Sequence, residues 1–191
     1  LVDQKYQIVS KFNLNNGQKN AFQGIMNFLG ETATNTYALI GSAGTGKTTI
    51  VDTVLASMGV NGMPNRSIIL SAPTHRANAV TRSKNDPNIP VMTLHSLLGL
   101  TPEDESLFDD GPKKTGFTMD LDQENKYLTP DTLLIVDESS MIDDALYAAL
   151  MDAVAKVPGI KVLFLGDAAQ LKPVNQTTVS KALTATQNKS E

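Results

Sequence analysis

The chain has 191 residues, of which 41% are hydrophobic and 19% are charged, as in globular domains and unlike disordered chains. It contains no cysteine, which excludes disulfides and thiolate metal sites. The net charge of −4 and the pI of about 5.2 argue against binding nucleic acid through an overall basic field, so any such binding depends on local groups. Because no apolar run approaches membrane-spanning length and the N-terminus lacks a signal-peptide pattern, we expect a soluble, cytoplasmic protein with no membrane partner.

The first part of the chain predicts an arm, a helix and a strand. Residues 1–13 show no clear period and indicate either an extended N-terminal arm or a cloning remnant. Residues 18–29 place apolar side chains on one helical face, which predicts an amphipathic helix that begins in a polar cluster and ends near Gly30. An apolar run at 36–40 predicts a buried strand, and helical spacing predicts a helix over 48–56.

A glycine-rich loop joins this strand to this helix. Residues 41–48 read G-S-A-G-T-G-K-T and match the phosphate-loop pattern G-x-x-x-x-G-K-[ST] at every fixed position. The glycines leave the backbone N–H groups free to surround a triphosphate, Lys47 supplies a cation for the terminal phosphates, and the Thr48 hydroxyl can ligate Mg²⁺. The predicted nucleotide site consists of Gly41, Ser42, Ala43, Gly44, Thr45, Gly46, Lys47, Thr48 and Thr49.

The remaining core elements alternate between short apolar strands and amphipathic helices. They are strands at 67–72, 132–136 and 161–165 and helices at 75–84 and 143–156, with a further apolar stretch at 91–98. This alternation predicts an α/β fold with a parallel sheet flanked by helices. Residues 101–129 are acidic with little core pattern and predict a surface insertion, with a hairpin around 111–116. Polar residues over 176–191 predict a tail or linker.

Two polar motifs follow the last two predicted strands. Asp137 and Glu138 come directly after an apolar strand, where an aspartate faces the ligand crevice of a parallel sheet. Asp137 is suited to hold Mg²⁺, and Glu138 to orient or deprotonate an attacking water. After the last strand, Gln170 lies in G-D-A-A-Q-L-K-P-V and could contact the γ-phosphate; a simple turn is the alternative.

Five motifs in order carry a resemblance to a known family. They are G-S-A-G-T-G-K-T, A-P-T-H-R-A-N, T-L-H-S-L-L, V-D-E-S-S-M and G-D-A-A-Q-L-K-P-V, which resemble motifs I, Ia, Ib, II and III of superfamily 1 helicases. More narrowly, they resemble the RecD-like group (SF1B) and the Dda helicases of bacteriophages. The resemblance implies a RecA-like P-loop NTPase domain over 14–100 and 130–175. It also implies an ATP- and Mg²⁺-dependent motor, usually moving 5′ to 3′ on single-stranded DNA, in a phage-infected bacterial host cell.

The same resemblance assigns further roles. The catalytic residues would be Lys47, Asp137, Glu138 and Gln170, and Thr48 and Asp137 would bind Mg²⁺. Gln18 matches an upstream glutamine motif that recognises the adenine edge, although a polar residue in a first helical turn needs no such role. The insertion at 101–129 corresponds to a small subdomain whose hairpin splits the duplex junction; a solvated acidic loop is the alternative. The residues that would contact DNA are Thr74, His75, Arg76, Thr93, His95, Lys113, Lys114 and Phe117.

The chain departs from the family pattern in two ways. Lys172 stands where much of the superfamily has proline, and the chain stops before motifs IV, V and VI. Those motifs lie in a second RecA-like domain and include an arginine that contacts the γ-phosphate, whereas no arginine follows Arg82 here. We therefore expect the first motor domain of a longer helicase.

Other classes of function remain as alternatives. A GTPase is disfavoured because the chain contains no N-K-x-D motif, and a small-molecule kinase because only three arginines are present. A third alternative is a module that binds nucleotide and single-stranded DNA without turnover.

Overall fold

The computed structural model describes residues 5–74, 86–102, 117–119, 125–167, 169, 180–184 and 187–189. Its centre is a six-stranded sheet with the order β3-β2-β6-β7-β1-β8, in which every pair of neighbours is parallel. The strands are β1 (Thr36–Ile40), β2 (Ser67–Ala72), β3 (Val91–Thr93), β6 (Thr132–Val136), β7 (Lys161–Gly166) and β8 (Gln187–Lys189). The predicted α/β fold with a parallel sheet is confirmed.

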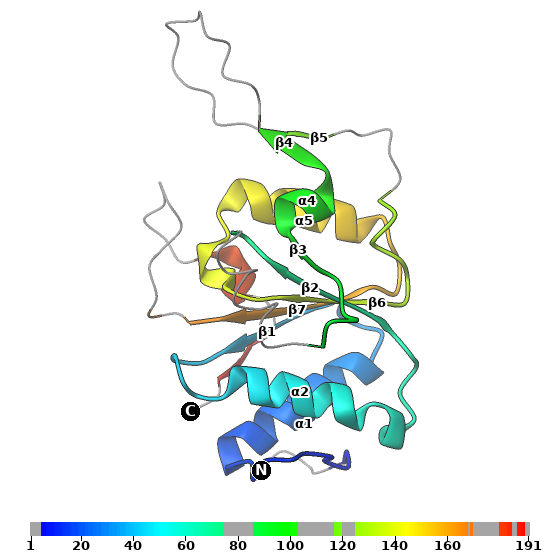
Figure 1. The fold of residues 1–191 in the computed structure, drawn as a ribbon, viewed down its shortest axis with the longest axis vertical. Coiled ribbons are helices and arrows are strands. Elements are labelled where there is room, and N and C mark those ends of the chain that lie inside the picture. The colour runs from blue at the N-terminus through cyan, green and yellow to red at the C-terminus, as the bar shows by residue number, and fades with distance from the viewer. Residues whose placement is uncertain are drawn as a thin grey trace, which may run out of the picture.

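Helices cover both faces of this sheet (Figure 1). One face packs against α1 (Asn16–Gly30) and α2 (Lys47–Ser57), and the other against α4 (Leu94–Leu98) and α5 (Asp144–Ala155). Successive residues of a strand point to opposite faces, so Leu133 joins the first core and Leu134 the second. Strands buried on both sides explain why they appear in the sequence as continuous apolar runs rather than as alternating patterns.

The central sheet aligns the chemical groups of the molecule. Because β1, β6 and β7 run in the same direction, their carboxyl ends meet at one edge. The phosphate loop follows β1, Asp137 follows β6, and Asp167 follows β7, which lies between the other two. This edge is the location expected for a ligand in an open parallel sheet.

The N-terminal arm is held on the α1–α2 side of the domain by side chains rather than by strand pairing. The buried amide of Gln23 accepts from Tyr6 N at 2.9 Å and donates to Tyr6 O at 2.8 Å. Asn61, in the 3₁₀ helix η1 (Gly59–Asn61), holds the backbone of Gln7 in the same way. Its side chain accepts from Gln7 N and donates to Gln7 O, each at 2.8 Å. The described part of the arm is therefore an ordered segment of the domain.

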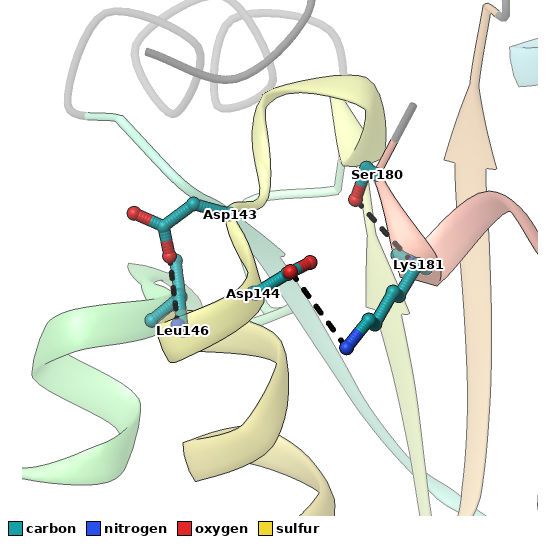
Figure 2. A network of polar contacts seen from close by, with 6 residues as sticks. Asp143, Asp144, Leu146, Ser180 and Lys181 are labelled. Atoms are coloured by element: carbon teal, nitrogen blue, oxygen red, sulfur yellow. Dashed lines mark hydrogen bonds and ion pairs between the residues drawn. The ribbon is translucent and has the colours of Figure 1, made fainter. Parts of the chain in front are cut away.

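The C-terminal segment, expected to be a tail or linker over 176–191, contains regular structure in its described part. Its described part contains the 3₁₀ helix η3 (Lys181–Thr184) and strand β8, which pairs with β1 at the edge of the sheet. Figure 2 shows Lys181 facing Asp144 of α5, with an N–O distance of 3.7 Å. Both side chains are at least half exposed, so this ion pair contributes only about 0–1 kcal/mol. Burial of Ala182 and Leu183, at 0% and 1% exposed, contributes more to holding the segment.

A smaller sheet lies beyond α4, formed by β4 (Leu100–Pro102) and β5 (Phe117–Met119). The two strands pair antiparallel, with Leu100 opposite Met119 and Pro102 opposite Phe117. The residues between them, and the helix expected at 75–84, lie outside the described residues. Among the helices that are described, none has both the length and the apolar content needed to span a membrane.

Candidate nucleotide-binding site

The phosphate loop is a compact turn between β1 and α2. Gly41 N donates to Gly166 O at 3.1 Å, which continues the pairing of β1 with β7 into the loop. Ser42 O then accepts from both Thr45 N at 3.2 Å and Thr45 Oγ1 at 2.8 Å, closing the turn. Gly44 and Gly46 adopt positive φ angles of 80° and 82°, a conformation that glycine reaches without strain. Such alternation of backbone conformation turns successive N–H groups to one side and favours an anion there.

The ammonium group of Lys47 lies over the beginning of this loop. Its Nζ donates to Gly41 O at 2.6 Å and to Ser42 O at 3.0 Å. Lys47 is also the first residue of α2, so its charge adds to the positive end of the helix dipole. Backbone donors, dipole and ammonium together make a site for a polyphosphate.

Asp137 and Glu138 follow β6 at the same edge. Asp137 N donates to Ser71 O at 2.9 Å, and Asp137 Oδ1 accepts from Glu138 N at 2.8 Å, so the carboxylate is fixed by its own turn. Glu138 has a φ of 55° and is the only non-glycine residue with positive φ in the described part of the chain. This conformation costs about 1–2 kcal/mol for a residue with a side chain, and strain of this kind is concentrated at functional sites.

Asp167 is a site residue that was not among the predicted ones. It is 8% exposed, and its two oxygens accept from different segments. Oδ2 accepts from Ala43 N of the phosphate loop at 3.2 Å, and Oδ1 accepts from Ala169 N at 2.8 Å. The signal that identified Asp137, an aspartate directly after a buried parallel strand, applies equally to Asp167 and could have found it. Gln170, predicted from the same motif, lies outside the described residues.

The donor set at this edge fits Mg²⁺. Thr48 and Asp137 offer a hydroxyl and a carboxylate, the hard oxygen ligands that Mg²⁺ binds. In the described part of the chain, no three His, Asp or Glu side chains form a metal cluster of their own. A hydroxyl and a carboxylate suit an ion that takes its remaining ligands from phosphate and water, as Mg²⁺ does in NTPases.

Gln18 connects helix α1 to the phosphate loop. Its Nε2 donates to Thr45 O at 3.1 Å, and its Oε1 accepts from Asn15 N at 3.0 Å. The residue predicted to recognise adenine thus lies against the loop, and both atoms of its amide are engaged with the protein.

The predicted nucleic-acid contacts are described only in part. Thr93, one of the predicted contacts, is 4% exposed, and its hydroxyl accepts from Ser96 N at 3.1 Å as the N-cap of α4. A buried capping hydroxyl is used inside the protein. Thr74, which lies just after β2, and His95, which lies in α4, are half-buried. Phe117 lies in β5, and the structure does not describe its side chain; His75, Arg76, Lys113 and Lys114 lie outside the described residues.

The chain is similar to several known proteins. The model of the AAA domain family matches residues 13–191. The chain is 34% identical over 159 residues to the RecBCD enzyme subunit RecD of Mycobacterium tuberculosis, covering 74% of this chain and 25% of that protein. It is 35% identical over 137 residues to the ATP-dependent RecD2 DNA helicase of Deinococcus radiodurans, covering 72% of this chain and 16% of that protein.

A third relative, RecD of Buchnera aphidicola, is 31% identical over 159 residues, with 75% of this chain and 24% of that protein covered. The chain thus spans about a quarter or less of the length of these relatives. A chain in the solved structure of PRRSV helicase is similar at 14% identity and a TM-score of 0.43, over 87% of this chain and 32% of that one. Because the family model spans nearly the whole chain, the chain belongs to the AAA domain family, and it is similar to RecD proteins.

Proposed function

We propose that the chain is the first RecA-like domain of an ATP-dependent DNA helicase. The observation that carries the proposal is the shared edge of the sheet, where the phosphate loop with Lys47 meets the carboxylates that follow β6 and β7. Similarity to RecD proteins and to a RecD2 DNA helicase supports the class of motor. Closeness to bacteriophage Dda helicases and movement from 5′ to 3′ rest on the five sequence motifs.

The chemistry proposed for this edge is ATP hydrolysis. The loop N–H groups and Lys47 would bind the phosphates, and Thr48 and Asp137 would hold Mg²⁺. Mg²⁺, when bound, neutralises charge that develops on the β- and γ-phosphates. Glu138 would accept a proton from the attacking water, which requires a carboxylate within reach of the γ-phosphate. Gln170 would contact the γ-phosphate and report its presence to the DNA-binding surface.

Single-stranded DNA and a duplex junction are the proposed partners. Thr74, His75, Arg76 and His95 would hold the strand, and the insertion with Lys113, Lys114 and Phe117 would lie at the junction. A second RecA-like domain is proposed to complete the motor, because the chain spans about a quarter of its RecD relatives. The inserted unit is proposed as 101–129 and the motor core as 14–100 with 130–175.

A second candidate is a module that binds nucleotide and DNA without turnover. It is favoured by the absence of any arginine after Arg82, since an arginine that contacts the γ-phosphate increases the rate of related NTPases by about 10³-fold or more. The isolated chain would then bind ATP but hydrolyse it only when another domain or copy supplies that group.

The test is ATP hydrolysis by this chain with and without single-stranded DNA, alongside ATP binding by the wild type and by Lys47→Ala. Binding that depends on Lys47, with turnover that is low or stimulated by DNA, supports the proposal. Robust turnover that is indifferent to DNA would instead indicate a P-loop enzyme of another class, such as a kinase. ATP binding that is unchanged in Lys47→Ala would refute the site.

A further inference from the structure

The side chain of Gln18 makes one contact more than its local role requires. Gln18 is the N3 residue of a capping box, in which Asn15 Oδ1 accepts from Gln18 N at 2.8 Å and Gln18 Oε1 accepts from Asn15 N at 3.0 Å. A glutamate would complete this box equally well, because only an acceptor oxygen is needed at N3. The amide nitrogen is needed for something else, and in this structure it donates to Thr45 O.

The side-chain amide of Gln18 lies close to the backbone of the phosphate loop. A Cβ placed on Gly46 would lie 2.5 Å from Gln18 Nε2, so the amide fills the space that a side chain at position 46 would need. Gly46 is also the N-cap of α2 and offers no side-chain cap of its own. The turn that leads into α2 is therefore held from outside, by a residue of α1.

Holding the Thr45 carbonyl also sets the direction of the next N–H group. The peptide between Thr45 and Gly46 is planar and trans, so its C=O and N–H point in opposite directions. With Thr45 O directed at Gln18, the Gly46 N–H is directed away from Gln18. The other loop bonds do not fix this peptide, because Thr45 N, Thr45 Oγ1 and Lys47 Nζ all donate to Ser42 O.

We propose that Gln18 is a positioning residue of the phosphate loop, which orients the Gly46 N–H toward the phosphates of a bound nucleotide. This inference rests on the proposed nucleotide-binding function and adds a role that does not involve the base. An adenine contact remains chemically available, since an amide carries two N–H donors and two oxygen lone pairs. The two roles differ in one measurable respect, because a loop contact acts on every ligand that carries the phosphates.

The experiment measures dissociation constants of the wild-type chain and of Gln18→Met for ATP, GTP and inorganic tripolyphosphate, each with Mg²⁺. Methionine keeps the approximate size of the side chain and removes both hydrogen bonds. We expect Gln18→Met to weaken all three ligands by a similar factor, about fivefold, the equivalent of one hydrogen bond of about 1 kcal/mol. The matched control is Asn15→Ala, which damages the same capping box but retains the Gln18–Thr45 contact and should leave the three constants near their wild-type values.

A second measurement does not depend on ligands. The Gly46 amide resonance should shift in Gln18→Met and stay in place in Asn15→Ala, which a general loosening of α1 would not produce. Selective loss of ATP affinity, with GTP and tripolyphosphate unchanged, would overturn the inference in favour of base recognition. Equal losses in Gln18→Met and Asn15→Ala would overturn it in favour of a helix-capping role. If the wild-type chain binds neither ATP nor tripolyphosphate, the proposed function itself fails.

Discussion

Asp167 Oδ2 accepts a hydrogen bond from the backbone N–H of Ala43, a residue 124 positions earlier in the chain, at 3.2 Å. The same carboxylate accepts from Ala169 N at 2.8 Å, so one buried side chain joins the phosphate loop to the segment after β7. β7 lies between β1 and β6, and therefore Asp167 stands between the nucleotide loop and the Asp137–Glu138 turn. A change of conformation after β7 would act directly on the loop through this carboxylate.

Replacing Asp167 by asparagine should disturb both partners. An amide has a single acceptor oxygen and would present an NH₂ group to one of the two N–H donors, leaving a buried donor unsatisfied. We expect Asp167→Asn to lower the free energy of unfolding by about 1–3 kcal/mol and to weaken ATP binding. Chemical denaturation and ATP titration measure the two effects.

The control for Asp167→Asn is Asp143→Asn. Asp143 Oδ1 accepts one hydrogen bond, from Leu146 N at 2.8 Å, as the N-cap of α5 (Figure 2). Asparagine caps helices about as well as aspartate, so this change should be nearly neutral. Equal effects of the two substitutions would contradict the linking role of Asp167.

Lys47→Ala should abolish ATP binding or nearly so, because the loop loses the ammonium that lies over Gly41 O and Ser42 O. Lys156→Ala, which removes the same charge from an exposed position at the end of α5, should bind ATP as the wild type does. Titration of each variant with ATP and Mg²⁺ makes the comparison. A similar loss in both variants would mean that overall charge, rather than the loop, determines binding.

Glu138 allows stability and activity to be separated. Because its φ of 55° suits glycine better than any other residue, Glu138→Gly should leave the free energy of unfolding unchanged or raise it by up to about 1 kcal/mol. The same change should remove turnover from the complete motor while ATP binding persists, since the carboxylate acts on water. Glu138→Gln, which keeps the strain, should also lose turnover and gain no stability. Normal turnover in either variant would exclude Glu138 as the base.

Strands β1, β2, β6 and β7 were predictable because each is a short apolar run between polar segments. Those at 36–40, 67–72 and 132–136 have the predicted bounds, and β7 extends one residue further, to Gly166. Because both faces of the sheet are buried, nearly every position of these strands takes an apolar residue, so each strand can be recognised from its own stretch of sequence. The phosphate loop was predictable for the same reason, because its glycines and lysine are adjacent in sequence.

Elements that depend on distant partners were not predictable. β8 is Gln-Asn-Lys, a polar triplet with no strand pattern, and it exists as a strand because β1 offers a parallel edge. The arm carries no periodicity because amide side chains from α1 and η1 hold its backbone. The positive φ of Glu138 has no signature in the sequence, since glycine is the residue that normally marks such a turn.

The arm gives a prediction about stability. Gln23→Ala should lower the free energy of unfolding by about 1–3 kcal/mol, since it removes both hydrogen bonds to the Tyr6 backbone from a buried amide. Asn27→Ala, at an exposed position of the same helix, should be neutral or slightly stabilising. Hydrogen exchange at the Tyr6 amide should accelerate in Gln23→Ala alone. Unchanged exchange in that variant would show that other contacts hold the arm.

Lys161 gives a prediction about pH. Its side chain is almost fully buried, with Nζ donating to Glu31 O at 2.8 Å and to Thr34 O, 4.6 Å from the centre of the Phe28 ring. Burial lowers the pKa of Lys161 below its usual value of 10.5; the nearby Glu31 charge opposes this shift and Arg66 adds to it. Between the lowered pKa and 10.5, the unfolded chain binds more protons than the folded one, so stability should rise with pH across that window. Below the lowered pKa both states are protonated and the contribution is constant.

Denaturation across the alkaline range should show this rise in the wild type and in Lys156→Met, whose lysine is exposed, and should show less of it in Lys161→Met. Equal slopes in all three proteins would mean that the Lys161 ammonium titrates as it does in the unfolded chain.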